Sequence, residues 1–403
     1  MLKNIIFLFT FLLFIETIFL FFAIKYFKLS KIDLFFVFFV SLLSYGFFVY
    51  EFFEFDRSIG ATHSLYWSIG FLLLHLVPKI ITILFWVISA VLILIPSSIF
   101  NNSNFNGRKE FIGKLGLGLA AIPFSSILYG IFKGKYNFKV VKTQIEFEDL
   151  PIDFDGFKIL QISDLHSGSF DNFDKINYAV NLINEQEYDI CLFTGDIVNT
   201  RATEFTPWVE TFKALKTPKF GKFSVLGNHD YGEYLDWPSI KAKEDNFKAI
   251  KALHGQIDFK LLTNEHILLK KAESTIALVG VENWGKKFKK AGDLNKATSG
   301  LSSSDFKILM SHDPSHWEYE VKEHPINCHL TLSGHTHGLQ FGIEIPGIIK
   351  WSPVQYVYKQ WAGLYKHLNR YVYVNRGFGF HAFPGRVGIW PEISVVELKK
   401  KVV

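Results

Sequence analysis

The first third of the chain is dominated by long apolar segments. They lack the polar face that a surface helix of a soluble domain shows. The hydrocarbon core of a bilayer requires about 20 apolar residues per helix. We therefore predict an all-α transmembrane bundle of about four helices, drawn from the segments Ile5 to Ile24, Leu34 to Tyr50, Leu65 to Ile95 and Phe111 to Phe132.

Charged residues occur in three of these segments. Glu16 is the only charged residue of the first, the third contains His75, Pro78 and Lys79, and the fourth contains Lys114. The third segment is long for one span and short for two, so a tilted or proline-kinked helix is predicted. The scarcity of paired charges within the spans disfavours a transporter.

After the apolar segments, the pattern changes to short β-branched runs separated by amphipathic stretches. This alternation is typical of a layered α/β fold. Strands are predicted over 157–163, 189–195, 222–227, 274–284, 306–312, 327–335, 370–377 and 392–400, and helices over 172–186 and 208–216. We divide the chain into a transmembrane region (1–135), a connector with strand-like alternation (136–156) and a catalytic domain (157–403).

Composition and charge agree with this division. The chain of 403 residues is 49% hydrophobic and carries a net charge of +5. The whole charge surplus lies in the transmembrane region, which leaves the remainder neutral and without a positive field for nucleic acid. The two cysteines, Cys191 and Cys328, lie in apolar strand-like runs and are predicted to be buried free thiols.

Five predicted strands run directly into Asp, Asn or His. In an open α/β sheet, ligands bind beyond the carboxyl ends of the strands, so we expect these side chains to meet. Oxygen and imidazole donors without thiolate suit Mn, Fe, Zn, Co or Mg. The candidate ligands are Asp164, His166, Asp196, Asn228, His312, His335 and His337.

Seven ligands are too many for one ion but fit two divalent ions if one carboxylate bridges them. Asp196 is the predicted bridge, because it follows a glycine and extends a central strand. Two such ions would clamp an in-line displacement at phosphorus and generate hydroxide near neutral pH. His229 would donate a proton to the leaving oxygen or stabilise the phosphoryl oxygens. Asp230 is predicted to orient that imidazole.

The motifs DLH, GD, GNHD, SHDP and GHTH, in this order, resemble those of the calcineurin-like metallophosphoesterase superfamily. The resemblance extends from Phe157 to the C-terminus. It implies an αββα sandwich and a metal-dependent hydrolase of phosphoric ester or acid anhydride bonds. It also assigns one metal to Asp164, His166, Asp196 and His337, and the other to Asp196, Asn228, His312 and His335.

A narrower resemblance concerns the C-terminal stretch NRGFGFHAFPGRVGIWPEISVVEL. It is similar to the tail of a membrane-anchored bacterial branch of the superfamily. This implies a phospholipid or a lipid-linked phosphoester as substrate, such as UDP-2,3-diacylglucosamine in lipid A biosynthesis. That branch usually has a glycine where this chain has Leu339, which affects the expected pocket shape rather than metal binding.

Several other polar residues have a less specific interpretation. His381 is a candidate to line the substrate cleft, and Arg386 either contacts a phosphate or lies on the solvated surface. Asp313 is expected to cap a turn with Pro314. Core or surface positions are expected for His254, His266, His316, His324, His329 and His367.

Two questions stay open at this point. A membrane receptor or scaffold without turnover is the alternative function, although the complete ligand set disfavours it. The expected location is a bacterial inner membrane. The segment GRKEFIGKLGLGLAAIPF resembles a twin-arginine export signal with Lys109 in place of the second arginine, which favours an extracytoplasmic catalytic domain. A nucleotide-sugar substrate would instead require the cytoplasmic face.

Overall fold

The computed structural model describes residues 2–27, 29–93, 105–345 and 347–401. The chain forms two compact units, one of residues 1–132 with 382–385 and the other of residues 133–381 with 386–403. The last two residues of the third apolar segment, and the side chains of Arg108 and Lys109 in the export-like segment, lie outside the described part.

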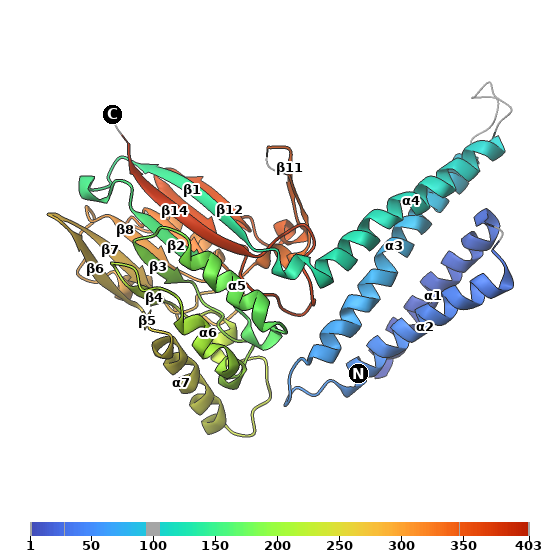
Figure 1. The fold of residues 1–403 in the computed structure, drawn as a ribbon, viewed down its shortest axis with the longest axis horizontal. Helices are drawn as coiled ribbons and strands as arrows, with labels where there is room; N and C mark the ends of the chain where they lie inside the picture. The colour runs from blue at the N-terminus through green and yellow to red at the C-terminus, as the bar shows by residue number, and fades with distance from the viewer. Residues whose placement is uncertain (1, 28, 94–104, 346, 402–403) are drawn as a thin grey trace. The chain divides into compact units, whose positions relative to one another are not determined.

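The first unit is helical, as predicted. Its helices are α1 (Leu2–Phe27), α2 (Lys31–Glu54), α3 (His63–Ile93) and α4 (Phe105–Phe132) (Figure 1). Each contains a stretch long and apolar enough to cross a membrane. The third predicted segment forms one helix that continues through Pro78.

Local sequence accounts for the ends and contacts of these helices. A capping box begins α2: the Asp33 backbone N–H donates to Ser30 Oγ at 3.2 Å, and the Ser30 N–H donates to the Asp33 carboxylate at 3.0 Å. Helices α3 and α4 pack closely at Gly116, where an added Cβ would lie 2.5 Å from Phe85 Cβ. Small residues permit such approach between membrane helices.

An ion pair lies inside the helical unit. Lys79 Nζ on α3 is 2.5 Å from Glu16 Oε2 on α1, and both side chains are buried. Lys79 also donates to Ser41 Oγ, and the Tyr45 hydroxyl donates to Glu16 at 3.1 Å, which adds α2 to the cluster. Glu16 therefore has a charged partner that its sequence neighbours did not reveal, and the cluster joins three of the helices.

The second unit contains two six-stranded sheets. The first has, in spatial order, β1 (Lys139–Phe147), β14 (Glu392–Lys400), β2 (Lys158–Ile162), β3 (Ile190–Phe193), β4 (Lys222–Ser224) and β5 (Lys260–Leu261). The second has β12 (Gly363–His367), β13 (Arg370–Val374), β9 (Leu330–Ser333), β8 (Lys307–Met310), β7 (Ser274–Gly280) and β6 (Glu265–Lys271). Both sheets are mixed, and each has a run of parallel strands at its centre.

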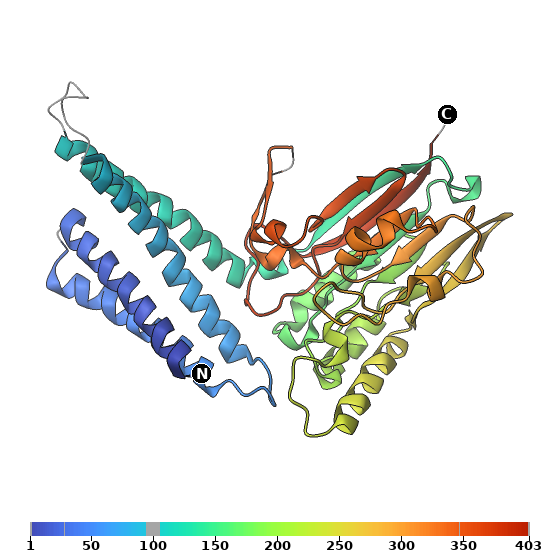
Figure 2. The same cartoon turned by 180° about the vertical axis from the view of Figure 1, so that it is seen from behind.

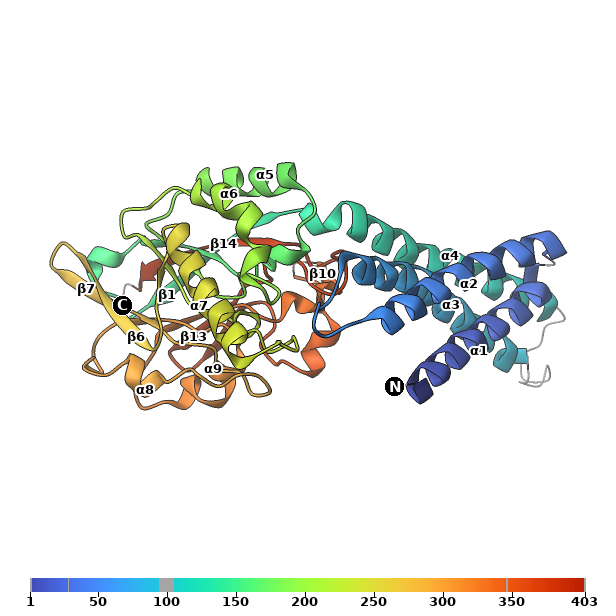
Figure 3. The same cartoon turned by 90° about the horizontal axis from the view of Figure 1, so that it is seen from below.

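Helices cover the outer face of each sheet. Side chains of α5 (Phe173–Asn184), α6 (Val209–Lys213) and α7 (Ile240–Gln256) share one core with the first sheet. A second core lies between the sheets, and α8 (Leu294–Ala297) and α9 (Ser315–Tyr319) pack on the second sheet in a third. Figure 3 shows α5 and α6 on one side of the strands and α8 and α9 on the other. The layers follow the predicted αββα order.

Several elements were not predicted, among them β5, β6, β12, α8 and α9. The connector forms a strand, β1, as its alternation indicated, but its parallel pairing with β14 was not predicted. Helix α7 was missed because few of its residues are apolar, although Ser239 caps it by accepting from the Ala242 N–H at 3.1 Å. A hairpin of β10 (Ile343–Ile345) and β11 (Ile349–Trp351) pairs with neither large sheet (Figure 2).

His254 on α7 should make the second unit sensitive to acid. Its ring is fully buried near Phe193, and neither ring nitrogen has a hydrogen-bond partner within the described structure. Burial lowers its pKa from 6.5 to about 3. Below pH 6.5, His254 therefore binds a proton in the unfolded chain but not in the folded one. The stability of the folded unit falls as the pH drops below this value.

We expect the variant His254→Leu to unfold at a higher temperature than the wild type, by a margin that grows towards acid pH. As the pH is lowered from about 6.5 to about 4, protonation of His254 in the unfolded chain should reduce the stability of the wild type by about 3 kcal/mol in total. Thermal unfolding of the detergent-purified chain across this pH range is the measurement. Substitution of the partly exposed His367 by leucine is the control. Parallel pH profiles for wild type and His254→Leu would contradict the expectation.

Candidate metal centre

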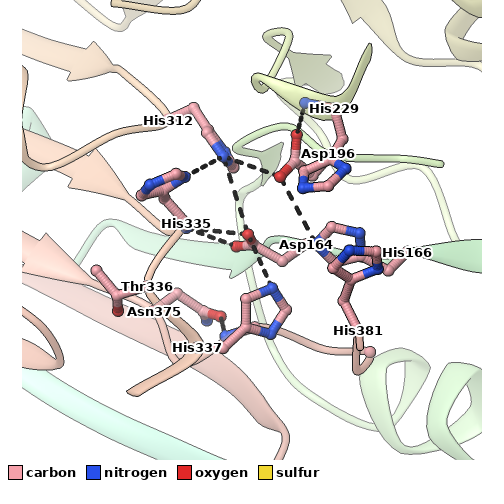
Figure 4. A network of polar contacts seen from close by, with 12 residues as sticks. Asp164, His166, Asp196, His229, His312, His335, Thr336, His337, Asn375 and His381 are labelled. Carbon is pink, nitrogen blue, oxygen red and sulfur yellow. Dashed lines mark hydrogen bonds and ion pairs between the residues drawn. The ribbon is translucent and has the colours of Figure 1, made fainter. Parts of the chain in front are cut away.

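All seven predicted ligands lie at the carboxyl ends of parallel strands from both sheets. Asp164 and His166 follow β2, Asp196 follows β3, and Asn228 follows β4. From the second sheet, His312 follows β8, while His335 and His337 follow β9. Figure 4 shows the side chains of six of them directed towards one another: Asp164, His166, Asp196, His312, His335 and His337. The seventh, Asn228, has its Oδ1 2.7 Å from His335 Nδ1. The structure therefore brings the whole predicted set together.

The backbone at the centre is unusual. Among the described residues, twelve other than glycine have a positive φ. Five of them are predicted ligands: Asp164 (55°), His166 (49°), Asp196 (61°), His335 (71°) and His337 (48°). The left-handed region costs an L-residue about 1–2 kcal/mol, and such strain gathers at functional sites.

Two glycines allow the carboxylates to approach other loops. A Cβ on Gly227 would collide with the Asp196 carboxylate, and a Cβ on Gly334 would collide with Asp164 and Ser163. The first of these glycines precedes Asn228 and the second precedes His335. The GN and GH pairs of the motifs therefore reflect packing against the carboxylates as well as ligand spacing.

Hydrogen bonds from outside the centre fix the orientation of its imidazoles. His312 Nδ1 lies 2.7 Å from the Thr194 carbonyl oxygen, which can only accept, so His312 directs Nε2 inwards. His335 is reversed: its Nε2 lies 2.7 Å from the Tyr358 hydroxyl, and its Nδ1 lies 2.7 Å from Asn228 Oδ1. Such outer contacts set the tautomer and ring position of histidine ligands.

Asp196 connects the two halves of the centre. Its Oδ2 lies 3.1 Å from His312 Nε2 and 3.6 Å from His166 Nε2. On one side, Asp164 Oδ1 is 3.3 Å from His337 Nε2. Among the described residues, three groups each bring one donor atom per residue within 4.8 Å of the others: Asp164, His166 and His337; His166, Asp196 and His229; and Asp196, His312 and His335.

These residues fit divalent metal ions. The donors are oxygen and imidazole nitrogen, without thiolate, as in sites for Mn, Fe, Zn and related ions. His337 Nε2 and Asp164 Oδ1 are buried at the centre 3.3 Å apart, yet no well-formed hydrogen bond joins them. A cation bound between such donors would satisfy both.

Charge in the centre follows from burial and mutual contact. Burial opposes ionisation of Asp164, but the nearby His337 and His312 hold its pKa below the ordinary range. Burial likewise opposes a charge on His312, yet the carboxylates of Asp196 and Asp164 raise its pKa to about 10. A cation bound at this position would compete with the proton for the imidazole.

His229 lies beside the ligands but is oriented differently from the prediction. Its Nδ1 lies 2.7 Å from the Asn199 carbonyl oxygen, which leaves Nε2 as the other functional nitrogen. Its ring stacks on Tyr234 at 4.4 Å and meets the His166 ring edge-on at 4.8 Å. The Asn199 carbonyl thus fixes this imidazole.

Asp230 does not orient His229, and that prediction is wrong. Its Oδ2 accepts from the backbone N–H groups of Asp196 (3.0 Å) and Gly227 (2.8 Å), and its Oδ1 accepts from Ile197 N–H (3.0 Å). Burial, followed by the charge of Asp196, raises the pKa of Asp230 to about 7. Its role is to hold the Asp196 and Asn228 loops together.

Two further residues contact the ligands and were missed as site residues. Asn199 Oδ1 lies 3.1 Å from His166 Nδ1 and 3.2 Å from His381 Nδ1. The sequence signal for Asn199 was its position three residues after Asp196. Tyr358 reaches His335 from a distant loop, and no motif marks it. His381 stacks on His166 at 4.9 Å, which places it at the centre.

Arg386 is neither a phosphate ligand nor a surface residue. It is fully buried, and its guanidinium donates to the carbonyl oxygens of Gly379 (2.9 Å), Arg376 (2.8 Å) and Gly377 (3.1 Å). One nitrogen also lies 3.0 Å from His337 Nδ1. Arg386 therefore supports a ligand and the loop around it. Asp313 caps its turn as predicted, through Ser315 N–H at 2.7 Å.

Comparison with known families agrees with both units. Residues 2–135 match the family model described as "Probable Calcineurin-like phosphoesterase, transmembrane domain". Residues 157–339 match the model "Calcineurin-like phosphoesterase". The second match ends two residues after the last predicted ligand.

Three relatives illustrate the range of similar proteins. The uncharacterized metallophosphoesterase YkuE of Bacillus subtilis is 32% identical over 62% of this chain and 82% of its own length. A transmembrane protein with metallophosphoesterase domain from Danio rerio is 27% identical, over 68% and 60%. The UDP-2,3-diacylglucosamine pyrophosphatase LpxG of Chlamydia muridarum is 25% identical, over 67% and 92%. Together with the donor set and the order of the motifs, these matches show that the chain belongs to the calcineurin-like phosphoesterases, a family of metal-dependent hydrolases. It also carries that family's four-helix membrane domain.

Proposed function

We propose that this protein is a membrane-anchored phosphoesterase that uses two divalent ions to hydrolyse a pyrophosphate or phosphodiester bond in a lipid-linked substrate. The observation that carries the proposal is the convergence of all seven ligand-type side chains in a chain that also has four helices long and apolar enough to cross a membrane. The proposed substrate resembles UDP-2,3-diacylglucosamine, an intermediate of lipid A biosynthesis. The relative LpxG, named for that activity, supports this choice and matches the present chain over 92% of its length.

The proposed ligands divide as the motifs suggest. Asp164, His166 and His337 would hold one ion, and Asn228, His312 and His335 the other, with Asp196 shared between them. The contacts of Asp196 with both halves support the sharing. When bound, such ions supply Lewis acidity towards the phosphoryl oxygens and lower the pKa of water.

The protein's own groups perform the other steps. His229 is held through Nδ1, so its Nε2 is the nitrogen that would deliver a proton to the leaving oxygen. Its backbone N–H donates to Asp196 Oδ1 at 2.8 Å, which couples its position to that of the shared carboxylate. His381, stacked on His166, would contact the substrate on the same side.

A hollow of about 320 Å³ supports an extended anionic substrate. Its wall includes Tyr358, the hydroxyl of which contacts ligand His335. It is also lined by Lys286 and Lys287, which would attract a second phosphate, and by Lys359, which pairs with Glu318 at 2.7 Å. The aromatic ring of Tyr319 lines the same hollow and would offer a stacking surface to a nucleobase.

The side of the membrane follows from the substrate. A nucleotide-linked lipid would place the second unit in the cytoplasm of a bacterium. The export-like segment around Arg108 favours the opposite face of the inner membrane. Turnover of the nucleotide-linked lipid would decide for the cytoplasmic side, since nucleotide sugars are found there.

The alternative function is a membrane receptor or scaffold without turnover. It would need none of the strained backbone at the ligands, because strain is kept where it serves binding or chemistry. The full donor set and the five left-handed ligand residues therefore favour the enzyme.

The test uses the full chain purified in detergent with added manganese. Hydrolysis of UDP-2,3-diacylglucosamine and of bis-p-nitrophenyl phosphate is measured, together with metal content. Turnover of both substrates, with the lipid preferred, is the expected result. Turnover of the generic diester alone would retain the phosphoesterase and reject the lipid nucleotide. Absence of metal and of turnover on both substrates would favour the scaffold.

A further inference from the structure

The small hairpin of β10 and β11 has an unusual distribution of side chains. Its register pairs Ile343 with Trp351, Glu344 with Lys350 and Ile345 with Ile349. Directly opposed residues of a hairpin share a face, and successive residues alternate. One face is therefore apolar, and the other carries Glu344 and Lys350.

The charged residues make the contacts of the hairpin with the rest of the protein, although Lys350 is itself exposed. Glu344 accepts from Arg376 Nε at 2.9 Å, and the exposed fraction of its side chain is only 24%. Lys350 Nζ donates to the Ala362 carbonyl oxygen and lies 5.0 Å from the Trp361 ring centre. These contacts anchor the hairpin to the second unit through its charged side chains.

The apolar face is turned outwards. Ile343 and Ile345 are each 49% exposed, Ile349 is 42% exposed, and Ile348 in the turn is 80% exposed. In a protein surrounded by water, a two-stranded sheet buries its apolar face and exposes its charges. The reversed arrangement is stable only if an apolar medium or partner covers the isoleucines.

Both ends of the hairpin are attached to the metal centre. Leu339, 54% exposed with a φ of 50°, lies two residues after ligand His337. Ser352, just past β11, donates through Oγ to the Gly338 carbonyl oxygen at 2.7 Å. Further on, Tyr358 contacts ligand His335. The base of the hairpin is therefore joined directly to the loops that carry the ligands.

The features of this surface favour a lipid bilayer over a protein partner. A stable protein interface takes about 20–30 residues on each side, and the hairpin with its flanks offers far fewer. Four membrane-crossing helices in the same chain bring a bilayer within reach. Tyr356 (78% exposed) and Val357 (65% exposed), which follow β11 in the chain, are exposed as well. An exposed tyrosine among exposed apolar side chains suits the membrane–water boundary.

We propose that the apolar face of this hairpin inserts into the bilayer. There it would contact the acyl chains of the lipid substrate while the headgroup of that substrate binds at the metal centre. The hollow lined by lysines supports this, because Tyr356 and Val357 belong to its wall as well. Apolar and cationic surfaces thus adjoin one another, as an amphipathic anionic lipid requires. The substrate part of this inference rests on the proposed function, and the membrane contact does not.

A fluorescent label tests the membrane contact without turnover. Cys191 and Cys328 are fully buried, so a cysteine introduced by Ile348→Cys can be labelled selectively with an environment-sensitive dye. The matched control is Leu368→Cys in the turn between β12 and β13, because Leu368 is 77% exposed. The full chain is reconstituted into vesicles of phosphatidylethanolamine and phosphatidylglycerol, with or without lipids brominated in their acyl chains.

We expect brominated lipids to quench the dye at position 348 several-fold more than the dye at position 368. Equal quenching at both positions would overturn the inference. So would a blue-shifted dye at position 348 that brominated lipid does not quench, because it would indicate a protein or a second copy as the occupant.

Turnover tests the contact with the substrate. Ile348→Asp should lower kcat/KM for the lipid substrate about tenfold, because the variant lacks the apolar contact between Ile348 and the acyl chains. Hydrolysis of bis-p-nitrophenyl phosphate should be unchanged. Equal turnover of the lipid by variant and wild type, or equal loss on both substrates, would overturn this part. If the wild type hydrolyses neither substrate, the proposed function fails, and the quenching result still decides the membrane contact.

Discussion

Asp196→Asn should reduce kcat for bis-p-nitrophenyl phosphate at least about a thousandfold, since several kcal/mol of charge stabilisation depend on the metals. Asn keeps the size of the side chain but removes its charge and one strong acceptor. Asp196 is in contact with His312 and His166 on opposite sides. Loss of the Asp196 carboxylate should therefore weaken metal binding in both halves of the centre.

Metal content makes this prediction specific. The purified variant should contain less than the wild-type amount of metal, and excess manganese should restore only a small part of the rate. Asp189→Asn is the matched control. Asp189 lies just before β3, whereas Asp196 follows that strand, and the Asp189 carboxylate accepts from the Lys158 N–H at 2.8 Å. Full activity in Asp196→Asn would exclude it as the shared ligand. Equal losses in both variants would point to unfolding instead.

His229→Gln should lower kcat by a different route. General acid catalysis contributes about a hundredfold to ten-thousandfold, and glutamine cannot supply the proton. His229 shares one donor group with His166 and Asp196 but is not needed to complete either half of the ligand set. We therefore expect the variant to keep its metal content and to change kcat far more than KM.

The leaving group distinguishes acid catalysis from simple positioning. An ester of p-nitrophenol leaves without protonation, so the variant should hydrolyse it almost normally, whereas esters of alkyl alcohols should show the full loss. His266→Gln is the control, because His266 Nδ1 also lies 2.8 Å from a backbone carbonyl oxygen, that of Ala297. The same loss for both kinds of leaving group would contradict the acid role. Metal loss in His229→Gln would make it a ligand.

The features that sequence predicted well were local ones. Apolar strands that end in Asp, Asn or His are visible as short runs, and the geometry of parallel sheets brings their carboxyl ends together. The seven ligand positions followed from this, whereas the αββα layers were implied by the resemblance to the calcineurin-like metallophosphoesterases. The four membrane helices followed from length and hydropathy alone.

Features that depend on distant contacts were missed. The Tyr358–His335 contact and the Glu16–Lys79 pair join residues with no common motif. Asp230 was assigned to its sequence neighbour His229, whereas its oxygens accept from the backbone of another loop. Proximity in sequence predicted contact here, and the tight turn after Asn228 directs the two side chains apart. The outward apolar face of the hairpin was also invisible, because an alternating pattern does not say which face looks at solvent.

The position of β14 has a consequence for biosynthesis. It lies between β1 and β2, and it pairs with both, although it is the most C-terminal strand described. During translation, β1 emerges directly after α4. Its partner strand β14 is synthesised only after all seven ligands. Until then, two strand edges stay open to wrong pairing. Metal loading should accordingly be a late, post-translational step, and cells that produce the protein faster than chaperones protect it should accumulate it as membrane-bound aggregates.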